Sequence, residues 1–459
     1  MNTNKNRLPY ILLFIFIIGF ILIAVKGLMV PQPGDENVYY YMGKLVSEGK
    51  VPYRDFFYAH PPLHIYLISA VYRIFGFNIV ILKSIPLISA ILSSIFVFCI
   101  TKNKYGSPEA IAASLLYLFS YSVMFNSVFS FGIDVAVMLM LAGIFFLWNR
   151  NSPIAAGVFF GLAGITRLLV IVPIIIIFAS ALLSDKKNLF KALCGFLIIF
   201  LPVNLIFSSL GGDYITQAYK FHFLKSSEGG KNLREYADII KLNWILFLSA
   251  IPFFFLKEKK RIGIFAIISA VYLLFLMLLK KIFGFYFLAA FPFLAITGGF
   301  CIVNLIRELS LKKRAAVLAY AMLVLLFSWN LASDTRFIEK FGFMGFERGN
   351  SMSDFIKSKS GSKTILFGDD SAAPLLALMS GSRIAFDFVD TNEQVFISGI
   401  KNLKDYLSSL KGKDIIFIIR SRQGISSFPE TREFLNSNCE LSGSFHDTQE
   451  GDYIFYRCG

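Results

Sequence analysis

The chain has 459 residues, of which 56% are hydrophobic and 51 are phenylalanine. Its mean hydropathy of +0.64 is far above that of a soluble enzyme and is typical of an integral membrane protein. The net charge of +15 does not indicate nucleic-acid binding, because the excess is confined to residues 1–349, which carry 33 Lys and Arg against 16 Asp and Glu, whereas residues 350–459 carry 12 against 14.

Apolar segments separated by basic clusters predict an α-helical polytopic protein with about eleven membrane-spanning helices. The first segment is longer than the apolar part of a signal peptide and no cleavage site follows it, so we expect it to be retained. Lys and Arg cluster at every second helix end, as expected for cytoplasmic loops. We therefore expect a multi-pass protein of the plasma membrane with a cytoplasmic N-terminus and with everything after Leu331 outside the cytoplasm. The predicted spans are 9–30, 80–101, 108–126, 133–149, 153–166, 168–184, 189–210, 241–256, 262–279, 286–304 and 315–332.

Residues 1–332 thus form the predicted transmembrane domain, and a different pattern begins near Ser351. Short apolar runs separated by polar helical stretches predict a small extracytoplasmic α/β domain over residues 350–459. The sequence Gly368-Asp369-Asp370 ends one predicted strand and is interpreted as a structural turn.

Two of the five cysteines, Cys439 and Cys458, lie in this predicted domain. An oxidising compartment permits a disulfide between them only if their geometry allows it, so the sequence leaves the pairing open. Neither cysteine has the spacing of a metal site.

The first outer loop, residues 31–79, begins with two adjacent carboxylates, Asp35 and Glu36. The apolar residues that follow recur at helical spacing up to Gly49 and predict a short helix in the plane of the membrane interface. Asp35 could simply cap this helix, since aspartate is favoured at helix N-termini. Its position at the membrane surface also suits chemistry on a lipid-borne substrate.

The same loop continues with a Tyr-Arg-Asp segment, 53–55, and with His60-Pro61-Pro62-Leu63. An acidic pair after the first span, an interfacial helix ending in Gly, and these two segments in this order resemble the GT-C membrane glycosyltransferases. The resemblance is greatest to the protein O-mannosyltransferases and the bacterial lipid A aminoarabinose transferase. It implies an inverting transfer of a sugar from a polyprenyl phosphate to a protein, lipid or glycan acceptor on the extracytoplasmic face.

Further segments extend the resemblance. Asp134 resembles the second acidic position of the family, and the segment 161–167, which ends in Arg167, is similar to its Gly-Leu-Ala…Thr-[Lys/Arg] motif. The segment around Tyr286 resembles the [His/Arg]-Tyr…Pro stretch, although Phe285 stands where a basic residue is common. Ala59 stands before His60 where relatives have Glu, so the sequence predicts no certain cofactor and leaves a divalent metal open.

Transfer from a polyprenyl phosphate requires a base for the acceptor proton and cations for the departing phosphate. Asp35 is the predicted general base, with Glu36 and Asp134 as the other catalytic candidates. Candidates for binding the donor are Arg54, Asp55, His60, Arg167, Lys280, Lys281 and Tyr286. Arg167 could instead be a helix-end residue that snorkels, and the two lysines could lie in a solvated loop.

Two other classes of protein fit parts of the sequence. A secondary transporter or a lipid flippase of cell-envelope precursors would also be polytopic, but a transporter should show paired halves with helix breaks near the middle of the membrane. A non-catalytic assembly protein would need only the outer domain, and Asp35 would then be dispensable. The sequence does not indicate which sugar or acceptor is used.

Overall fold

The computed structural model describes residues 7–226, 229–255, 259–310, 313–361, 363–421, 424–448 and 451–459. The chain divides into two compact units, which we describe separately. The helical unit comprises Met1–Leu28, Lys83–Leu205 and Glu228–Phe343. The sheet unit comprises Met29–Leu82, Ile206–Ser227 and Met344–Gly459.

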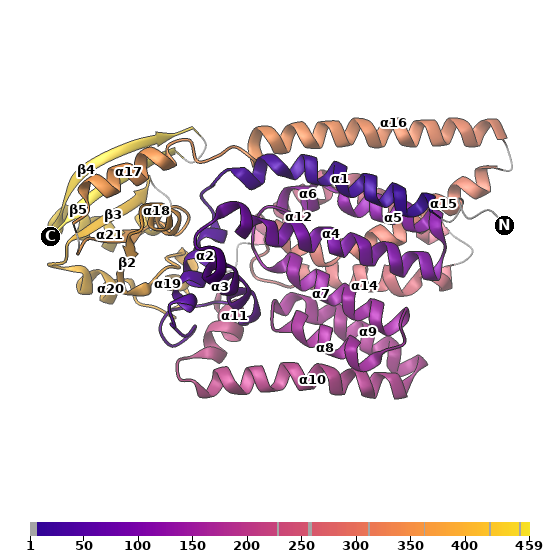
Figure 1. Ribbon diagram of the computed structural model, residues 1–459, viewed down its shortest axis with the longest axis horizontal. Helices are drawn as coiled ribbons and strands as arrows, with labels where there is room; N and C mark the ends of the chain where they lie inside the picture. Colours follow the sequence, from indigo (N-terminus) through magenta and orange to yellow (C-terminus); the bar gives the residue numbers. More distant parts are fainter. Residues whose placement is uncertain are drawn as a thin grey trace. The chain divides into compact units, whose positions relative to one another are not determined.

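The helical unit is a bundle of long and short helices (Figure 1). Its 3-10 turns are η2 (Leu168–Val170), η4 (Ile251–Phe255) and η5 (Gly284–Ala289), and its π-helical turn is η6 (Ile338–Gly342). Its α-helices are α1 (Leu8–Met29), α4 (Ile79–Lys104), α5 (Ser107–Leu118), α6 (Tyr121–Asn126), α7 (Ile133–Trp148), α8 (Pro153–Gly164), α9 (Ile171–Ser184), α10 (Lys186–Ser209), α12 (Gly229–Leu242), α13 (Trp244–Ala250), α14 (Lys259–Met277), α15 (Phe291–Ser310) and α16 (Lys313–Phe337).

Several of these helices have the length and composition of membrane spans. Among the described residues, four helices qualify, or five if the bent pair Lys231–Leu242 and Trp244–Phe255 is one span. Only 22% of the apolar window of α1 and 11% of that of α10 are buried within the protein, so both expose wide apolar faces that lipid can cover. Shorter apolar helices occupy most of the other predicted spans, and the number of crossings stays a prediction.

Two predicted spans are broken. Residues 108–126 form α5 and α6 with a break at Phe119 and Ser120, and α12 and α13 meet at an angle of 81° around Asn243. The Asn243 side chain accepts a hydrogen bond from the backbone N–H of Ser122 at 3.0 Å, so it joins the two breaks. Polar groups freed by a break are thus satisfied inside the protein, as a membrane protein requires.

The sheet unit contains a five-stranded sheet in the order β2-β1-β3-β5-β4. The strands β1 (Ile365–Gly368), β2 (Arg383–Ile384) and β3 (Ile415–Arg420) are parallel, whereas β5 (Gly451–Cys458) runs antiparallel to β3 and to β4 (Cys439–Asp447). The other elements of the unit are α2 (Asp35–Ser47), α3 (Leu63–Phe75), η3 (Thr216–Lys220), α11 (Phe221–Leu224), α17 (Gly349–Lys359), α18 (Ala373–Ser380), η7 (Ala385–Asp387), α19 (Glu393–Ile397), α20 (Leu403–Leu410), η8 (Gly424–Ser427) and α21 (Pro429–Asn438).

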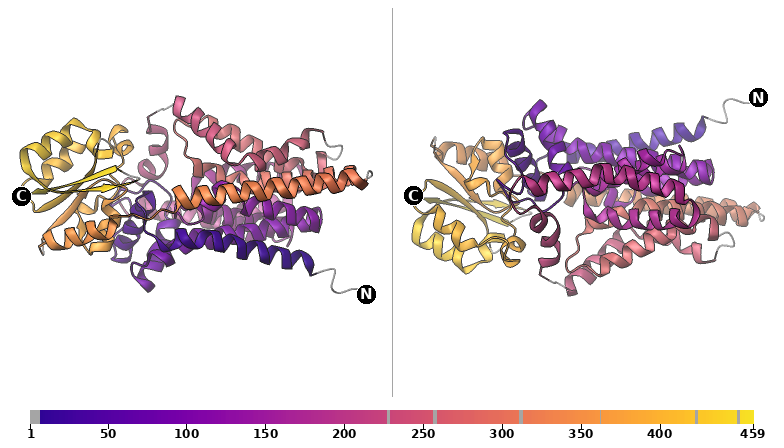
Figure 2. Two further views of the ribbon diagram at one scale, coloured as in Figure 1. Left: turned by 90° about the horizontal axis from the view of Figure 1, so that it is seen from above. Right: turned by 90° about the horizontal axis from the view of Figure 1, so that it is seen from below.

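Helices cover both faces of the sheet (Figure 2). Phe355 of α17 packs on Phe455 at a ring distance of 5.4 Å, and Phe434 of α21 packs on Phe417 at 6.1 Å from the opposite face. The core also includes Phe57 of the first outer loop and Phe221 of α11. The α/β segment therefore shares its core with two segments from much earlier in the chain.

Cys439 and Cys458, whose pairing the sequence left open, form a disulfide. They face each other across β4 and β5 with 4.1 Å between their Cα atoms. The bond fastens the last strand to the edge strand of the sheet.

Candidate functional site

Asp35 is the first residue of α2 and is exposed, while Gly34 holds the capping position. The structure therefore does not support the interpretation of Asp35 as the helix cap. The side chain of Asn37 donates to the carbonyls of Gln32 at 2.7 Å and Gly34 at 3.0 Å, which fixes the approach to the helix. Glu36 is buried, and its carboxylate folds back over Gly34.

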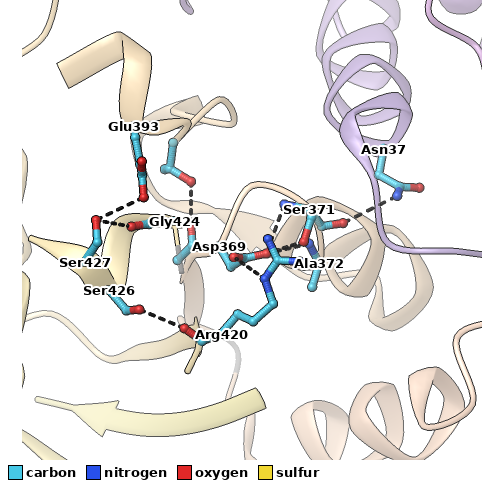
Figure 3. Close-up of polar contacts among 11 residues, drawn as sticks. Asn37, Asp369, Ser371, Ala372, Glu393, Arg420, Gly424, Ser426 and Ser427 are labelled. Atoms are coloured by element: carbon cyan, nitrogen blue, oxygen red, sulfur yellow. Dashed lines mark hydrogen bonds and ion pairs between the residues drawn. The ribbon is translucent and has the colours of Figure 1, made fainter. Parts of the chain in front are cut away.

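The backbone N–H of Gly34 donates to the carbonyl of Ser371 at 3.1 Å. Ser371 belongs to the turn after β1 (Figure 3), where the carboxylate of Asp369 accepts from the backbone N–H groups of Ser371 at 3.1 Å and Ala372 at 3.2 Å. Asp369 is fully buried and pairs with Arg420 of β3 at 3.6 Å. Asp369 thus orders the turn, which agrees with its structural interpretation.

Asp370, the next residue, has a different environment. It is buried, and this burial raises the pKa of its carboxyl well above the usual range, with further contributions from the negative charges of Asp369, Asp35 and Asp390. A buried carboxyl with a raised pKa keeps its proton at a pH where an exposed aspartate has lost it. Because the charge of Asp35 acts on this carboxyl, Asp370 belongs to the surroundings of Asp35.

Asp390 completes this group of carboxylates. Burial raises the pKa of Asp390 to about 6, and the charge of Asp35 adds to the shift. The backbone N–H of Asn392, which donates to Asp390 at 3.2 Å, and the positive charge of Lys225 act in the opposite direction. Asp35, Asp370 and Asp390 thus form a cluster of three acidic residues, in which Asp35 is the exposed member.

His60 is held from three directions. Its Nε2 lies 3.1 Å from the hydroxyl of Tyr39, which is one turn after Asp35 on α2, so the helix carries both side chains on one face. Its ring stacks on His222 at 5.3 Å, and its carbonyl accepts from the hydroxyl of Tyr53 at 2.6 Å. His222 Nε2 donates to the carbonyl of Ala59 at 2.8 Å, so this nitrogen carries a proton.

Arg54 and Asp55 pair with each other through two hydrogen bonds of 2.9 and 3.0 Å. Asp55 also accepts from the backbone N–H of Val51 at 2.7 Å, and the hydrogen bond from Arg54 lowers the pKa of its carboxyl. This pair shapes the loop between α2 and α3.

The helical unit brings together Asp134 and Arg167. Asp134 lies buried in the first turn of α7, after Gly132. Arg167, also buried, follows α8 and donates to the carbonyl of Phe131, just before that turn, and its charge acts on Asp134. The Phe131 ring stacks on Phe285 at 4.6 Å.

The remaining candidates lie between α14 and α15. Tyr286 is buried in η5, where its carbonyl accepts from the hydroxyl of Tyr272 at 2.8 Å. Lys280 is exposed and its carbonyl accepts from Asn232, whereas the ammonium of Lys281 lies 5.5 Å from the Phe283 ring. Within the described ranges, no three His, Cys, Asp or Glu side chains are grouped so that they could hold a metal ion.

Sequence reasoning did not assign Asp370 or Asp390 to the site. One signal was available for Asp370, because a pair of acidic residues directly after a parallel strand lies at the edge where α/β sheets bind ligands. Asp390 lies in an irregular segment after η7 and carries no such signal.

The family model described as dolichyl-phosphate-mannose-protein mannosyltransferase matches residues 59–208. No curated protein matches the chain in sequence.

Solved structures share the fold over nearly the whole chain. ArnT from Cupriavidus metallidurans bound to undecaprenyl phosphate matches with a TM-score of 0.65 at 14% sequence identity, and the match covers 96% of this chain and 97% of ArnT. The apo state of the same protein matches with a TM-score of 0.68 at 13% sequence identity and with the same coverage. The oligosaccharyltransferase AglB from Archaeoglobus fulgidus, in complex with an inhibitory peptide and a dolichol-phosphate, gives 0.59 at 11%, covering 99% of this chain and 74% of AglB. The GT-C resemblance inferred from the sequence is confirmed.

Proposed function

We propose that the protein is a membrane glycosyltransferase that takes a sugar from a polyprenyl phosphate and passes it to a protein, lipid or glycan acceptor. Support comes from the match to a mannosyltransferase family and from a fold shared with proteins solved with undecaprenyl phosphate and dolichol-phosphate. The N-terminus is cytoplasmic and the sheet unit extracytoplasmic in this proposal, because basic clusters alternate along the chain.

Asp35 is the general base. It accepts the proton of an acceptor hydroxyl as that oxygen attacks the anomeric carbon of the sugar. The bond from this carbon to the phosphate oxygen breaks, the phosphate keeps the electron pair, and the configuration inverts. A positioned base of this kind contributes about 10²–10⁴-fold to a rate.

One observation carries this assignment: Asp35 is exposed at the start of α2 while the backbone on its N-terminal side is tied to the β1 turn. A base has to reach the acceptor without moving, and this arrangement combines exposure with a fixed backbone. The buried carboxyl of Asp370, whose raised pKa favours its protonated form, also limits the repulsion around an ionised Asp35.

Cations bind the departing phosphate. In the sheet unit we assign His60 to this role. Taken separately, Arg167, Lys280 and Lys281 are the donor-binding candidates of the helical unit, because fixed positive charge stabilises growing negative charge. Asp134 orients Arg167 through its charge, Tyr286 lines the donor site, and Glu36 supports the backbone at Gly34. Arg54 and Asp55 contribute as a pair that shapes the loop before His60.

The proposal is tested by supplying purified protein with a panel of radiolabelled polyprenyl-phosphate sugars together with protein, lipid and glycan acceptors. We expect label to leave at least one donor and to appear on an acceptor. Protein in vesicles that moves the labelled lipid between leaflets without cleaving it would contradict the proposal and favour a flippase.

A further inference from the structure

The side chain of Gln217 spans the loop that leads to His60. Its Oε1 accepts from the backbone N–H of Tyr58 at 3.0 Å, and its Nε2 donates to the carbonyl of Tyr53 at 2.8 Å. The amide orientation is fixed by these partners, since an N–H can only donate and a carbonyl can only accept. Gln217 is 4% exposed and lies in the π-helical turn η3.

The loop that Gln217 spans is strained. Tyr53 has a φ of 70°, a left-handed conformation that is uncommon outside glycine. It persists only if the surroundings hold it, and strain of this kind gathers at functional sites. The Tyr53 ring packs on Tyr214 at 4.7 Å and on Phe207 at 5.6 Å.

The strained residue also contacts His60 directly. The Tyr53 hydroxyl donates to the His60 carbonyl at 2.6 Å, while the Tyr58 ring lies 5.9 Å from the imidazole. Gln217 therefore holds the backbone at Tyr53 and at Tyr58, and both of these residues contact His60. Bonds that hold a backbone in this way fix the direction of the side chains it carries.

We propose that Gln217 is a positioning residue for His60: its amide clamps residues 53–58 so that the imidazole is held against Tyr39, ready for the phosphate of the donor. The inference rests on the proposed function, in which His60 contacts that phosphate. Gln217 itself touches neither donor nor acceptor. Its loss should raise the KM for the donor and leave kcat nearly unchanged.

Two substitutions separate the clamp from simple packing. Q217L keeps the approximate size and removes both hydrogen bonds. Q217E keeps the acceptor for Tyr58, but an ionised carboxylate cannot donate to the Tyr53 carbonyl. When the carboxyl group introduced by Q217E is protonated, it can donate again, and burial favours that protonated form.

Donor KM and kcat are measured for wild type and both variants between about pH 5.5 and about pH 8.5. We expect Q217L to raise the donor KM at least about fivefold at every pH, with kcat within about twofold of wild type, because one buried group is left unsatisfied at each end of the clamp. Q217E should match wild type at low pH, and its donor KM should rise above that of wild type as the pH increases, because the bond to the Tyr53 carbonyl is then lost. A donor KM unchanged in Q217L, or a Q217E-to-wild-type ratio that does not vary with pH, would overturn the proposal.

Q394E is the matched control. Gln394 is also buried in the sheet unit, and its Oε1 accepts hydrogen bonds from the backbone N–H and from the hydroxyl of Ser226, each at 3.0 Å. A carboxylate at this position can still accept both of these hydrogen bonds. It should leave the donor KM unchanged across the same pH range. A pH-dependent rise in the donor KM of Q394E like that of Q217E would show that any buried carboxylate produces the effect, and would count against the clamp.

Hydrogen exchange of the Tyr58 amide in the full chain distinguishes failure of the clamp from failure of the proposed function. We expect faster exchange in Q217L, whether or not any donor is bound. Unchanged exchange would overturn the clamp even in an active enzyme. If wild type binds no polyprenyl phosphate, the proposed function fails, and the exchange of Q217L still decides whether Gln217 holds the loop.

Discussion

The backbone N–H of Gly34 donates to the carbonyl of Ser371, and this 3.1 Å hydrogen bond joins the start of α2 to the turn after β1. Each partner lies next to a carboxylate: Asp35 follows Gly34, and Asp370 precedes Ser371. The same contact thus fixes the backbone of the proposed base and brings it near a buried acid. The turn after β1 is therefore part of the proposed site.

Replacement of Asp390 by Asn should change the pH dependence of stability. Burial raises the pKa of Asp390 to about 6 in the folded protein, above the value of about 3.9 for an unfolded chain. Protonated Asp390 therefore favours the folded state. This contribution to stability is fully present below the pKa of the unfolded chain and is lost as the pH rises through the pKa of the folded protein. Above about pH 6, D390N should therefore be more stable than wild type, by no more than about 3 kcal/mol.

Thermal unfolding of both proteins between about pH 4 and about pH 8 checks this expectation. The two melting temperatures should approach each other toward the acidic end, where Asp390 is protonated in the folded protein. A D390N protein that melts below wild type at neutral pH would show that the carboxylate is stabilised by its partners.

Replacement of Gly212 by Ala should disturb the loop that carries His60. Gly212 has a φ of 83°, and a Cβ there would lie 2.5 Å from the carbonyl oxygen of Tyr53. G49A is the matched control, because Gly49 has a φ of 92° and no atom within 4 Å of such a Cβ. Both variants should lose about 1 kcal/mol from backbone strain, and G212A alone should lose more because of the close contact and should also raise the donor KM. Equal melting temperatures and equal donor KM in the two variants would show that the close approach has no effect.

Reduction of the disulfide between Cys439 and Cys458 should loosen the sheet. The bond closes a loop with a sequence separation of 19, so its removal should cost about 2–4 kcal/mol of unfolding free energy. Thermal melts of the C439S/C458S double variant and of reduced wild type should agree with each other. If the double variant and the reduced protein melt at the same temperature as the oxidised wild type, a stabilising role of the disulfide is contradicted.

Replacement of Arg167 by Ala should weaken binding of the polyprenyl phosphate. The guanidinium donates to the Phe131 carbonyl and acts on Asp134, so its loss removes a cation and also loosens the start of α7. R150A is the control, because Arg150 is exposed and lies over the Phe145 ring. Titration with unlabelled polyprenyl phosphate should give a Kd about tenfold higher in R167A and unchanged in R150A. An unchanged Kd in R167A would leave Arg167 with a structural role only.

The sequence predicted much of what is local. The order of Asp35, Gly49 and His60 indicated the resemblance to the GT-C glycosyltransferases, because this order can be read from one short stretch of the sequence. The apolar runs 364–367, 414–419 and 453–456 likewise predicted strands where β1, β3 and β5 lie, whereas the run 383–388 forms only the short strand β2 before η7, and β4 was not predicted. The disulfide could not be predicted, because it depends on the register of β4 and β5, which contains a bulge between Leu441 and Gly443.

Tertiary contacts account for what was missed. The proximity of Asp370 to Asp35 arises from one backbone hydrogen bond between segments far apart in the chain, and no local pattern encodes it. Gln217 lies in a segment without a motif, and its proposed role follows only from its two backbone partners. The break at Asn243 similarly depends on a contact with Ser122.

Sugar transfer by D35N, measured beside donor binding, tests the central claim most directly. Asn keeps the size of the side chain but cannot accept the proton, so a base role predicts a loss of transfer of at least about 10²-fold. The melting temperature of D35N and its Kd for the donor should stay near those of wild type. D354N is the control, because Asp354 is exposed and pairs with Lys357 at 3.3 Å, and it should retain full activity. Transfer by D35N at a rate close to wild type would contradict the assignment of Asp35 as the base.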